Sequence, residues 1–313
     1  MVTHVIEPIR EAIQGCFSPN LPPILTVDPG DRVRYRTLDA SWGKVGNRDF
    51  HLDLPQFERV PERDAGLPLC GPIVIRGARP GDTLEVRIER IVPDRWGWTW
   101  AGPGYGTGDG LGLDEEVRVL WEIDAAHGIA SDVSGLGVIL PIRPFMGMMG
   151  NAPAAPGYHT PFPPRRVGGN MDCRELVAGS TLWLPVEVDG ALFSIGDGHA
   201  AQGDGEVSRM AIECPMDQVE LTFNLRRDLK LHLPQADTPA GYLTIGIGQT
   251  LDEAQKVALN GMLDHLQRIT GFGRSHAMAL ATCVVQLRVT QIVNGIVGIH
   301  ALLPPNAFTL VPE

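Results

Sequence analysis

The densest group of side chains able to do chemistry lies between residues 196 and 206. The segment reads Gly-Asp-Gly-His-Ala-Ala-Gln-Gly-Asp-Gly-Glu, which places one imidazole and three carboxylates among glycines and alanines. An alternating apolar stretch ends just before it, and a strand end holds side chains on a rigid element, as a metal site or an acid–base pair requires. A solvated Gly-Asp turn is the alternative, but a turn would not need so many polar side chains. These are Asp197, His199, Gln202, Asp204 and Glu206.

A second candidate is the segment Gly168-Gly169-Asn170-Met171-Asp172. Paired glycines free backbone N–H groups, and such a concave nest of N–H donors can hold an oxyanion. Asn170 and Asp172 stand beside the pair, where they could add a hydrogen bond or a ligand. An ordinary turn is the alternative at this place.

Glu213 is a third candidate because it interrupts the apolar run Met-Ala-Ile-Glu-Cys at residues 210–214. A carboxylate among apolar residues needs a partner, a metal or a raised pKa. The alternative is a charge on the open face of a strand. Asp39 presents a similar but weaker case, and a cysteine nucleophile at Cys173 is not expected, since no His or Lys stands nearby in sequence to lower its thiol pKa.

The elements that must position these residues are mostly short strands. The chain has 37 glycines and 26 prolines, about a fifth of its 313 residues, which favours many turns over a helical bundle. Pro-Gly turns at residues 28–31 and 79–82 each lead into an alternating strand. Residues 182–194 predict a hairpin around Asp189-Gly190, residues 219–225 predict a half-buried strand, and residues 94–170 predict long loops.

The C-terminal part has helical spacing instead. Thr250 and Glu253 form a capping-box pattern that starts a helix ending at Gly271, and a second helix is predicted from about residue 274 to 285, followed by a β-branched stretch over 287–297. The predicted fold class is β-rich α+β, with a two-lobed β-sandwich or barrel-like core and a C-terminal helical segment. We predict one composite domain over residues 1–313, with lobes at 1–165 and 166–313, because no low-complexity linker divides the chain.

Charge and composition exclude several classes of partner. The net charge of −11, with no long run of Lys or Arg, argues against nucleic-acid binding. No stretch is apolar and long enough to span a membrane, and the first residues do not form a signal-peptide pattern, so we expect a cytoplasmic protein. The five scattered cysteines signal neither a disulfide framework nor a thiolate zinc site.

At these residues the sequence resembles the acetamidase/formamidase family of amide hydrolases over nearly its whole length. The matching motifs are residues 26–31 (TVDPGD), 37–40 (TLDA), 71–82 (GPIVIRGARPGD), 143–147 (RPFMG), 168–172 (GGNMD) and 196–206 (GDGHAAQGDGE). The resemblance implies an amidohydrolase acting on non-peptide C–N bonds, which converts small linear amides of the formamide or acetamide type to carboxylate and ammonia. It also implies a homo-oligomer, a dimer or tetramer, and a divalent metal, with zinc expected and calcium as the alternative.

Amide hydrolysis needs a nucleophile at neutral pH, support for a tetrahedral oxyanion and a proton for the departing nitrogen. We expect Asp172, His199 and Asp197 to hold the metal. Glu213 or Glu206 would move the proton. Backbone N–H groups of Gly168 and Gly169, or Asn170, would support the oxyanion. Two alternatives stay open: a hydrolase that opens a small lactam or cyclic amide, and a non-catalytic homologue with a binding role.

Overall fold

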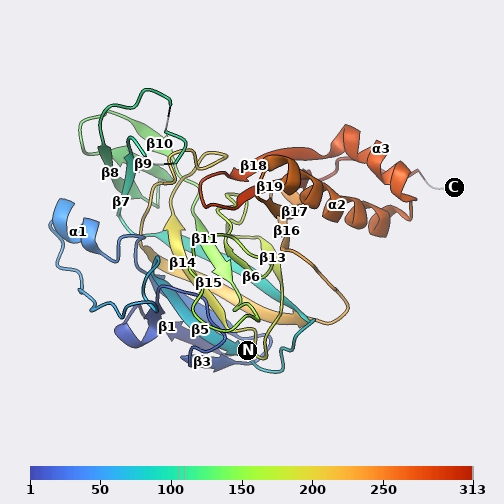
Figure 1. Cartoon of the computed structure of the whole chain (residues 1–313), viewed down its shortest axis with the longest axis horizontal. Coiled ribbons are helices and arrows are strands. Elements are labelled where there is room, and N and C mark those ends of the chain that lie inside the picture. The colour runs from blue at the N-terminus through green and yellow to red at the C-terminus, as the bar shows by residue number, and fades with distance from the viewer. Residues whose placement is uncertain (105, 109, 312–313) are drawn as a thin grey trace.

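Three β-sheets form the framework of the computed structural model, which describes residues 1–104, 106–108 and 110–311 (Figure 1). The largest sheet has nine strands among these residues and takes them from both halves of the chain. Its order is β1 (Thr3–Ile6), β4 (Arg32–Thr37), β15 (Met216–Arg226), β6 (Thr83–Pro93), β13 (Thr181–Pro185), β16 (Gln235–Thr238), β17 (Gly241–Gly248), β19 (Val297–Leu303) and β18 (Gln286–Gln291).

Two smaller sheets complete the β structure of the described residues. The six-stranded sheet contains β12 (Gly168–Asn170), β11 (Phe145–Gly150), β14 (Phe193–His199), β5 (Leu69–Ile75) and β2 (Ile13–Gln14), with β3 (Leu25–Val27) paired to β5. The four-stranded sheet runs β10 (Ile139–Pro141), β9 (Ile129–Asp132), β8 (Val117–Asp124) and β7 (Trp96–Ala101). Along the described chain none of the three sheets closes into a barrel.

The main core fills the space between the nine-stranded and six-stranded sheets. Alternating residues of β15 and β6, such as Leu221 and Ile88, face Ile73 and Ile195 of the smaller sheet in one buried cluster. Phe193 of β14 meets Phe223 of β15 edge to face, with ring centroids 5.1 Å apart. The sheets therefore pack as layers, and the apolar alternation of residues 219–225 correctly predicts a strand with one face in this core.

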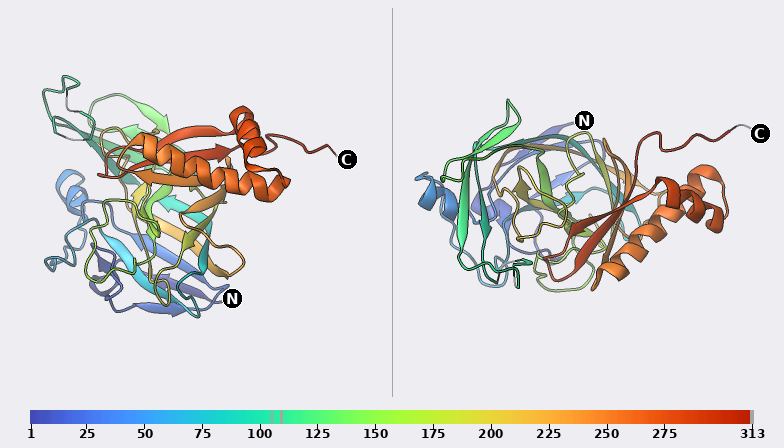
Figure 2. Two further views of the ribbon diagram at one scale, coloured as in Figure 1. Left: turned by 45° about the vertical axis from the view of Figure 1, so that its right-hand side comes forward. Right: turned by 90° about the horizontal axis from the view of Figure 1, so that it is seen from above.

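The C-terminal helices lie on one end of the large sheet. Helix α2 (Leu251–Thr270) packs against β17 and β19 through Ala254, Ala258 and Met262, and α3 (Arg274–Val284) continues away from the body (Figure 2). The predicted capping is present: the Thr250 side chain accepts a hydrogen bond from the Glu253 N–H, although the Glu253 carboxylate caps the N–H of Gln249. The β-rich α+β class with a C-terminal helical segment is confirmed.

Short helices and connections complete the chain. A 3-10 turn, η1 (Arg10–Ala12), precedes β2, and α1 (Lys44–Asp49) lies beside β7. Asp39 fixes the start of α1, since its carboxylate accepts from the N–H groups of Ser41 and Gly43 and from the Trp98 indole. Asp39 is therefore placed as a structural anchor of this loop.

Two sequence predictions of local structure are wrong. Residues 182–194 do not form a hairpin: β13 pairs with β6 and β16, whereas β14 pairs with β11 and β5 in the other sheet. Gly190, Ala191 and Leu192 all have positive φ, so the chain swings from one layer to the next instead of turning back. Residues 94–170 are not only loops, because they hold the four-stranded sheet and β11 and β12.

None of the helices in the described residues has the length and apolar character needed to cross a bilayer. The five cysteines are free, and Cys283 alone of them is exposed. The division into lobes at residue 165, like the cytoplasmic location, stays a prediction.

His265 of α2 makes the stability of this helical end depend on pH. Its ring stacks on Tyr242 at 3.5 Å between centroids, and burial, reinforced by the charge of Arg268, lowers its pKa to about 4. The unfolded chain then binds more protons than the folded one between about pH 6.5 and pH 4, so stability falls as the pH falls through this range. We expect the wild type to lose up to about 3 kcal/mol more unfolding free energy there than His265→Gln in urea titrations. His276→Gln, at an exposed position of α3, should keep the wild-type pH profile, and parallel profiles for wild type and His265→Gln would contradict the assignment.

Candidate active site

Five ionisable side chains from distant parts of the sequence meet in one buried cluster. Asp197 and His199 stand on β14, Asp172 follows β12, and Glu206 and Glu213 lie in the connection from β14 to β15. All five are buried, with Asp172 and His199 fully inaccessible. The structure thus brings together every residue that the sequence predicts as a metal ligand or proton carrier.

The contacts within the cluster centre on the His199 imidazole. Its Nε2 atom lies 3.3 Å from Glu213 Oε1 and 3.5 Å from Asp197 Oδ2. Two sets of potential ligand atoms have all members within 4.8 Å of one another: one joins Asp172, His199 and Glu206, and the other joins Asp197, His199 and Glu213. His199 belongs to both sets, so it is the common member of the cluster.

Gln202 determines which nitrogen of His199 carries the proton. The Gln202 side-chain amide donates to the Asp172 carbonyl oxygen at 2.9 Å, which leaves its Oε1 atom facing His199 Nδ1 at 3.0 Å. An amide oxygen only accepts, so Nδ1 must donate and the neutral ring then presents the lone pair of Nε2 to the carboxylates. A lone pair facing two carboxylates is unfavourable unless a positive charge, a proton or a metal ion, stands between them.

Backbone strain marks the same residues. Asp172, Asp197 and Glu206 have φ values of 48°, 60° and 50°, in the left-handed region that side chains other than glycine rarely adopt. Glu213 is held differently, by isolated β-bridges to Trp98 on one side and to His199 on the other. Residues kept in strained conformations by their surroundings cluster at functional sites, which supports a functional role for this cluster.

Burial and mutual repulsion disturb the ionisation of the cluster. Burial raises the pKa of Asp172 to about 8, with Asp197 adding to the rise and His199 opposing it. Burial also raises the pKa of Glu206 and of Glu213 above their usual range. Burial lowers the pKa of His199, but the charges of Glu213 and Asp197 outweigh it and hold that pKa well above its usual value. So many buried carboxylates need added positive charge.

The residues present fit a divalent cation. Buried atoms without a hydrogen-bond partner include Asp172 Oδ1, Asp197 Oδ1, His199 Nε2, Glu206 Oε2 and Glu213 Oε2. Gly147 of β11 leaves the space between them open, because a Cβ there would lie 2.6 Å from Asp172 Oδ1 and 2.8 Å from Asp197 Oδ2. Carboxylate oxygens with one imidazole are a donor set that zinc and other divalent metals accept.

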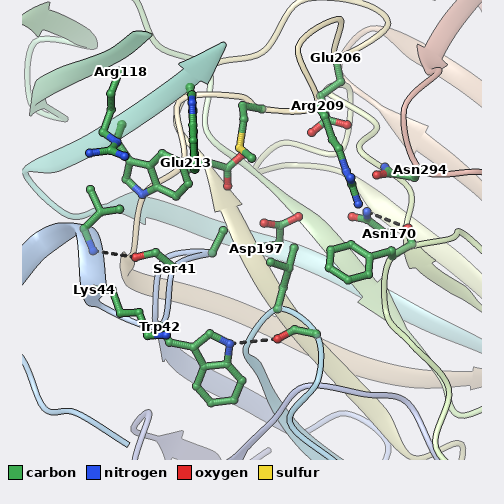
Figure 3. A pocket seen from close by; sticks show the side chains of 18 of the residues that line it. Ser41, Trp42, Lys44, Arg118, Asn170, Asp197, Glu206, Arg209, Glu213 and Asn294 are labelled. Atoms are coloured by element: carbon green, nitrogen blue, oxygen red, sulfur yellow. Dashed lines mark hydrogen bonds between the residues drawn. The ribbon is translucent and has the colours of Figure 1, made fainter. Parts of the chain in front are cut away.

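A cavity of about 510 Å³ opens onto this cluster (Figure 3). Asp197, Glu206 and Glu213 line it, while His199 and Asp172 lie behind them. Asn170 and Arg209 stand on one side of the cavity, and Trp42, Lys44 and Arg118 lie on the other, as Figure 3 shows. A substrate in this cavity would reach the carboxylates directly.

Of the predicted oxyanion donors, Asn170 lines the cavity but Gly168 and Gly169 do not. The Gly168 N–H donates to the Arg165 carbonyl oxygen at 3.0 Å, and neither Gly168 nor Gly169 is among the residues that line the cavity. Asn170 does line it, with its Nδ2 atom donating to the Phe162 carbonyl and its Oδ1 atom buried without a partner. Substrate binding by the two glycines rests on the sequence pattern and stays a prediction.

Asn294, in the connection between β18 and β19, is a site residue that the sequence does not reveal. Its Nδ2 atom donates to Asp172 Oδ2 at 2.6 Å. The backbone N–H of Asn294 donates to Gln291 Oε1, which fixes the backbone at this position. An Asn-Gly pair after a strand predicts only a turn. Burial of the Asn294 side chain beside Asp172 could be found only from the structure.

We expect Asn294→Ala to lower activity and metal affinity by about 10- to 100-fold, because partners that orient ligands carry effects of this size. Metal titration and steady-state kinetics of the purified variant would measure both. Asn224→Ala is the matched control and should leave both quantities unchanged, since Asn224 of β15 contacts Glu85 of β6 and does not line the cavity. Wild-type metal affinity in Asn294→Ala would show that the contact to Asp172 has no role.

A family profile described as the Acetamidase/Formamidase family matches residues 6–160 and 154–312 of the chain. The chain belongs to the acetamidase/formamidase family. This confirms the resemblance that the motifs around Asp172 and His199 carry.

Individual members of the family are similar at a moderate level. The chain is 27% identical over 251 residues to the formamidase of Methylophilus methylotrophus, covering 63% of this chain and 60% of that protein. It is 27% identical over 252 residues to the acetamidase of Mycolicibacterium smegmatis, covering 61% of this chain and 60% of that protein. The matches therefore span about three fifths of the length of these curated relatives.

Solved structures of the acetamidase/formamidase family match nearly the whole chain. The acetamidase from Bacillus halodurans is 30% identical, with a TM-score of 0.81 over 96% of this chain and 97% of that one. The predicted acetamidase/formamidase from Thermoanaerobacter tengcongensis is 27% identical, with a TM-score of 0.83 over 97% of this chain and 96% of that one. A gamma lactamase from Delftia acidovorans shares the fold at 20% identity, with a TM-score of 0.64.

Proposed function

We propose that the chain is an amidohydrolase that converts amides to carboxylate and ammonia with the help of a divalent metal. The buried cluster of Asp172, Asp197, His199, Glu206 and Glu213 at the floor of an open cavity is the observation that carries this proposal. The names of the family members, formamidase and acetamidase, support the same reaction.

Asp172, His199 and Asp197 would hold the metal, since each offers a buried atom that lacks a partner. When bound, a divalent cation supplies positive charge that lowers the pKa of water toward neutrality and polarises a carbonyl group. Gln202 keeps the proton of His199 on Nδ1 and its lone pair on Nε2, and Asn294 orients the Asp172 carboxylate. Both residues would position the ligands, and Asn294 also lines the cavity.

Glu213 and Glu206 both face the cavity and each has one oxygen without a partner. A carboxylate at this place can take a proton from the attacking water and deliver it to the amide nitrogen, which must leave as ammonia. Glu213 is held by the Ala211 N–H, which donates to its Oε1 at 3.0 Å and leaves Oε2 available. Comparing Glu213→Gln with Glu206→Gln separates the two, because only the proton carrier should lose turnover while retaining metal.

Asn170 suits the binding of the amide nitrogen. Its Oδ1 atom is an acceptor without a partner in the cavity wall, and an amide substrate offers N–H donors. The N–H contact would hold the leaving group near the two glutamates, and the remaining N–H of Asn170 could still support the oxyanion.

The proposal is tested by measuring metal content on protein purified without chelator, together with ammonia release from formamide and acetamide before and after chelation. We expect about one or two metal ions per chain and turnover that chelation abolishes and metal restores. Chelator-insensitive turnover would contradict a metal-dependent mechanism. Bound metal without ammonia release from any amide, but with opening of a five-membered lactam, would favour the lactamase alternative.

Zinc is our proposal for the metal, because the donor set includes an imidazole nitrogen beside carboxylate oxygens, and zinc accepts both. Calcium would favour an all-oxygen set. A homo-oligomer, a dimer or tetramer, stays a prediction that light scattering would test.

A further inference from the structure

The cavity above the buried cluster is much larger than formamide or acetamide. At about 510 Å³ it falls in the range of pockets that hold drug-sized ligands, roughly 300–1,000 Å³. Acetamide is about as large as a few water molecules at roughly 30 Å³ each. A small amide would therefore leave most of this cavity to water, whereas a substrate with a larger body would fill it.

The wall of the cavity is aromatic. Trp42, Trp98, Trp100 and Phe162 line it, together with Met210. Trp42 and Trp98 are buried and rigidly held, since the Trp42 indole donates to the Gly66 carbonyl oxygen and the Trp98 indole donates to Asp39. Fixed aromatic faces bind flat apolar groups through burial and ring stacking. A two-carbon acyl group gains little from such a wall.

The lining of the cavity contains several cations, on a protein whose net charge is −11. These are Lys44, Arg48, Arg59, Arg118 and Arg209, whereas the carboxylates that line the cavity are Asp197, Glu206 and Glu213 of the buried cluster. Arg48 and Arg118 share the single carboxylate of Asp49, so one of their two positive charges is balanced. Among the described residues, Arg59 bonds to the carbonyl oxygens of Asp64 and Gly66 and stacks over Trp42, and no carboxylate there forms an ion pair with it.

Arg209 is the cation best placed to bind a ligand. Its guanidinium lies over the Phe162 ring, 5.2 Å from the centroid, and no ion pair joins it to a carboxylate of the described residues. The side chain extends from the Glu206 loop toward Asn170 (Figure 3), and the backbone holds it there with a φ of 64° and an N–H bond to the Glu206 carbonyl. A guanidinium presents a planar pair of donors that matches a carboxylate.

We propose that the preferred substrates are primary amides with an aromatic or similarly flat body and a carboxylate, whose negative charge Arg209 binds. This inference rests on the proposed amide hydrolysis and adds the substrate class. The amide end reaches Glu206 and Glu213, the body lies along the tryptophans, and the carboxylate meets Arg209 beside Phe162.

Ammonia release from four amides tests the proposal on the metal-loaded full chain. The probes are acetamide, phenylacetamide, 4-carboxyphenylacetamide and 4-acetylphenylacetamide, the last being a neutral compound of nearly the same shape as the third. We expect kcat/KM to rise from acetamide to phenylacetamide, and to be at least about tenfold higher for the carboxylate than for its neutral counterpart.

Variants at Arg209 test how much its positive charge contributes to the preference for the carboxylate substrate. Arg209→Gln should lower the ratio of kcat/KM for the carboxylate over the neutral counterpart by at least about tenfold, through KM, and Arg209→Lys should restore part of it. Arg227→Gln, at an exposed arginine near Gly77 and Asp82, should keep the wild-type ratio. Because a ratio of two substrates is measured on one enzyme preparation, partial misfolding cannot imitate the effect.

Each other result has a definite meaning. Acetamide as the best substrate overturns the inference and leaves the amidohydrolase proposal standing. Equal use of the carboxylate and its neutral counterpart, or an unchanged ratio in Arg209→Gln, overturns the role of Arg209. No ammonia from any of the four amides by folded, metal-loaded protein overturns the proposed function itself.

Discussion

Replacing His199 by Ala is expected to remove bound metal and to lower kcat/KM for amide hydrolysis by about a thousandfold or more. His199 is the common member of both groups of potential ligands, and its Nε2 atom faces Glu213 and Asp197 without a hydrogen-bond partner. The substitution would remove the only imidazole nitrogen of the cluster and leave carboxylates that repel one another. Elemental analysis of the purified variant and an ammonia assay measure the two effects.

The matched control is His159→Ala. His159 lies in the 151–167 connection, where its Nε2 contacts the Ala155 carbonyl oxygen away from the cluster, so this variant should keep metal and turnover. Circular dichroism of both variants checks that the fold is retained. A folded His199→Ala protein that holds its metal and remains fully active would contradict the assignment of the site.

Much of this site could be predicted from the sequence because its members occupy unusual local contexts. Asp197 and His199 follow an apolar run among glycines, and Glu213 interrupts an apolar segment. Each context signals that a polar side chain is forced into the interior, where only a partner or a cation can stabilise it. The structure places all three within one buried cluster.

The site could not be completed from the sequence because its supporting residues have ordinary contexts. Asn294 precedes a glycine in a turn, and Gly147 is one glycine among many; each acts through a contact to Asp172, far away in sequence. The function of Arg209 depends in the same way on Phe162. Such contacts arise from the packing of sheets, which a local pattern does not encode.

The same limit explains the wrong prediction for residues 182–194. Alternation around Asp189-Gly190 correctly predicts two strands, but it does not state that they pair with each other. Positive φ at three successive residues sends the chain into the other sheet, and β14 then carries Asp197 and His199 beside β11. The apolar alternation predicts a strand that ends where the 196–206 segment begins, whereas β14 extends to His199, so the sheet itself holds both site residues.

Replacing Gly147 by Ala is expected to lower metal affinity and kcat/KM by about a hundredfold or more while the chain still folds. The added Cβ would lie 2.6 Å from Asp172 Oδ1, 2.8 Å from Asp197 Oδ2 and 2.9 Å from His199 Cε1. Ordinary van der Waals contact begins at 3.4 Å, so Asp172 Oδ1 would have to move by about 0.8 Å (3.4 − 2.6). Displacement of about 1 Å at an active site can cost about a hundredfold in rate, and ligand geometry is similarly demanding.

Gly203→Ala provides the control, because a Cβ at Gly203 meets no atom within 4 Å and the residue belongs to the same loop as Glu206. It should retain full activity. The unfolding free energy of Gly147→Ala should differ from the wild type more with metal than in the presence of chelator, since the methyl group acts on the bound site as well as on packing. Gly147→Ala could instead lose the same unfolding free energy with metal as with chelator and keep wild-type turnover. That result would mean that the metal and the substrate amide do not meet beside Gly147.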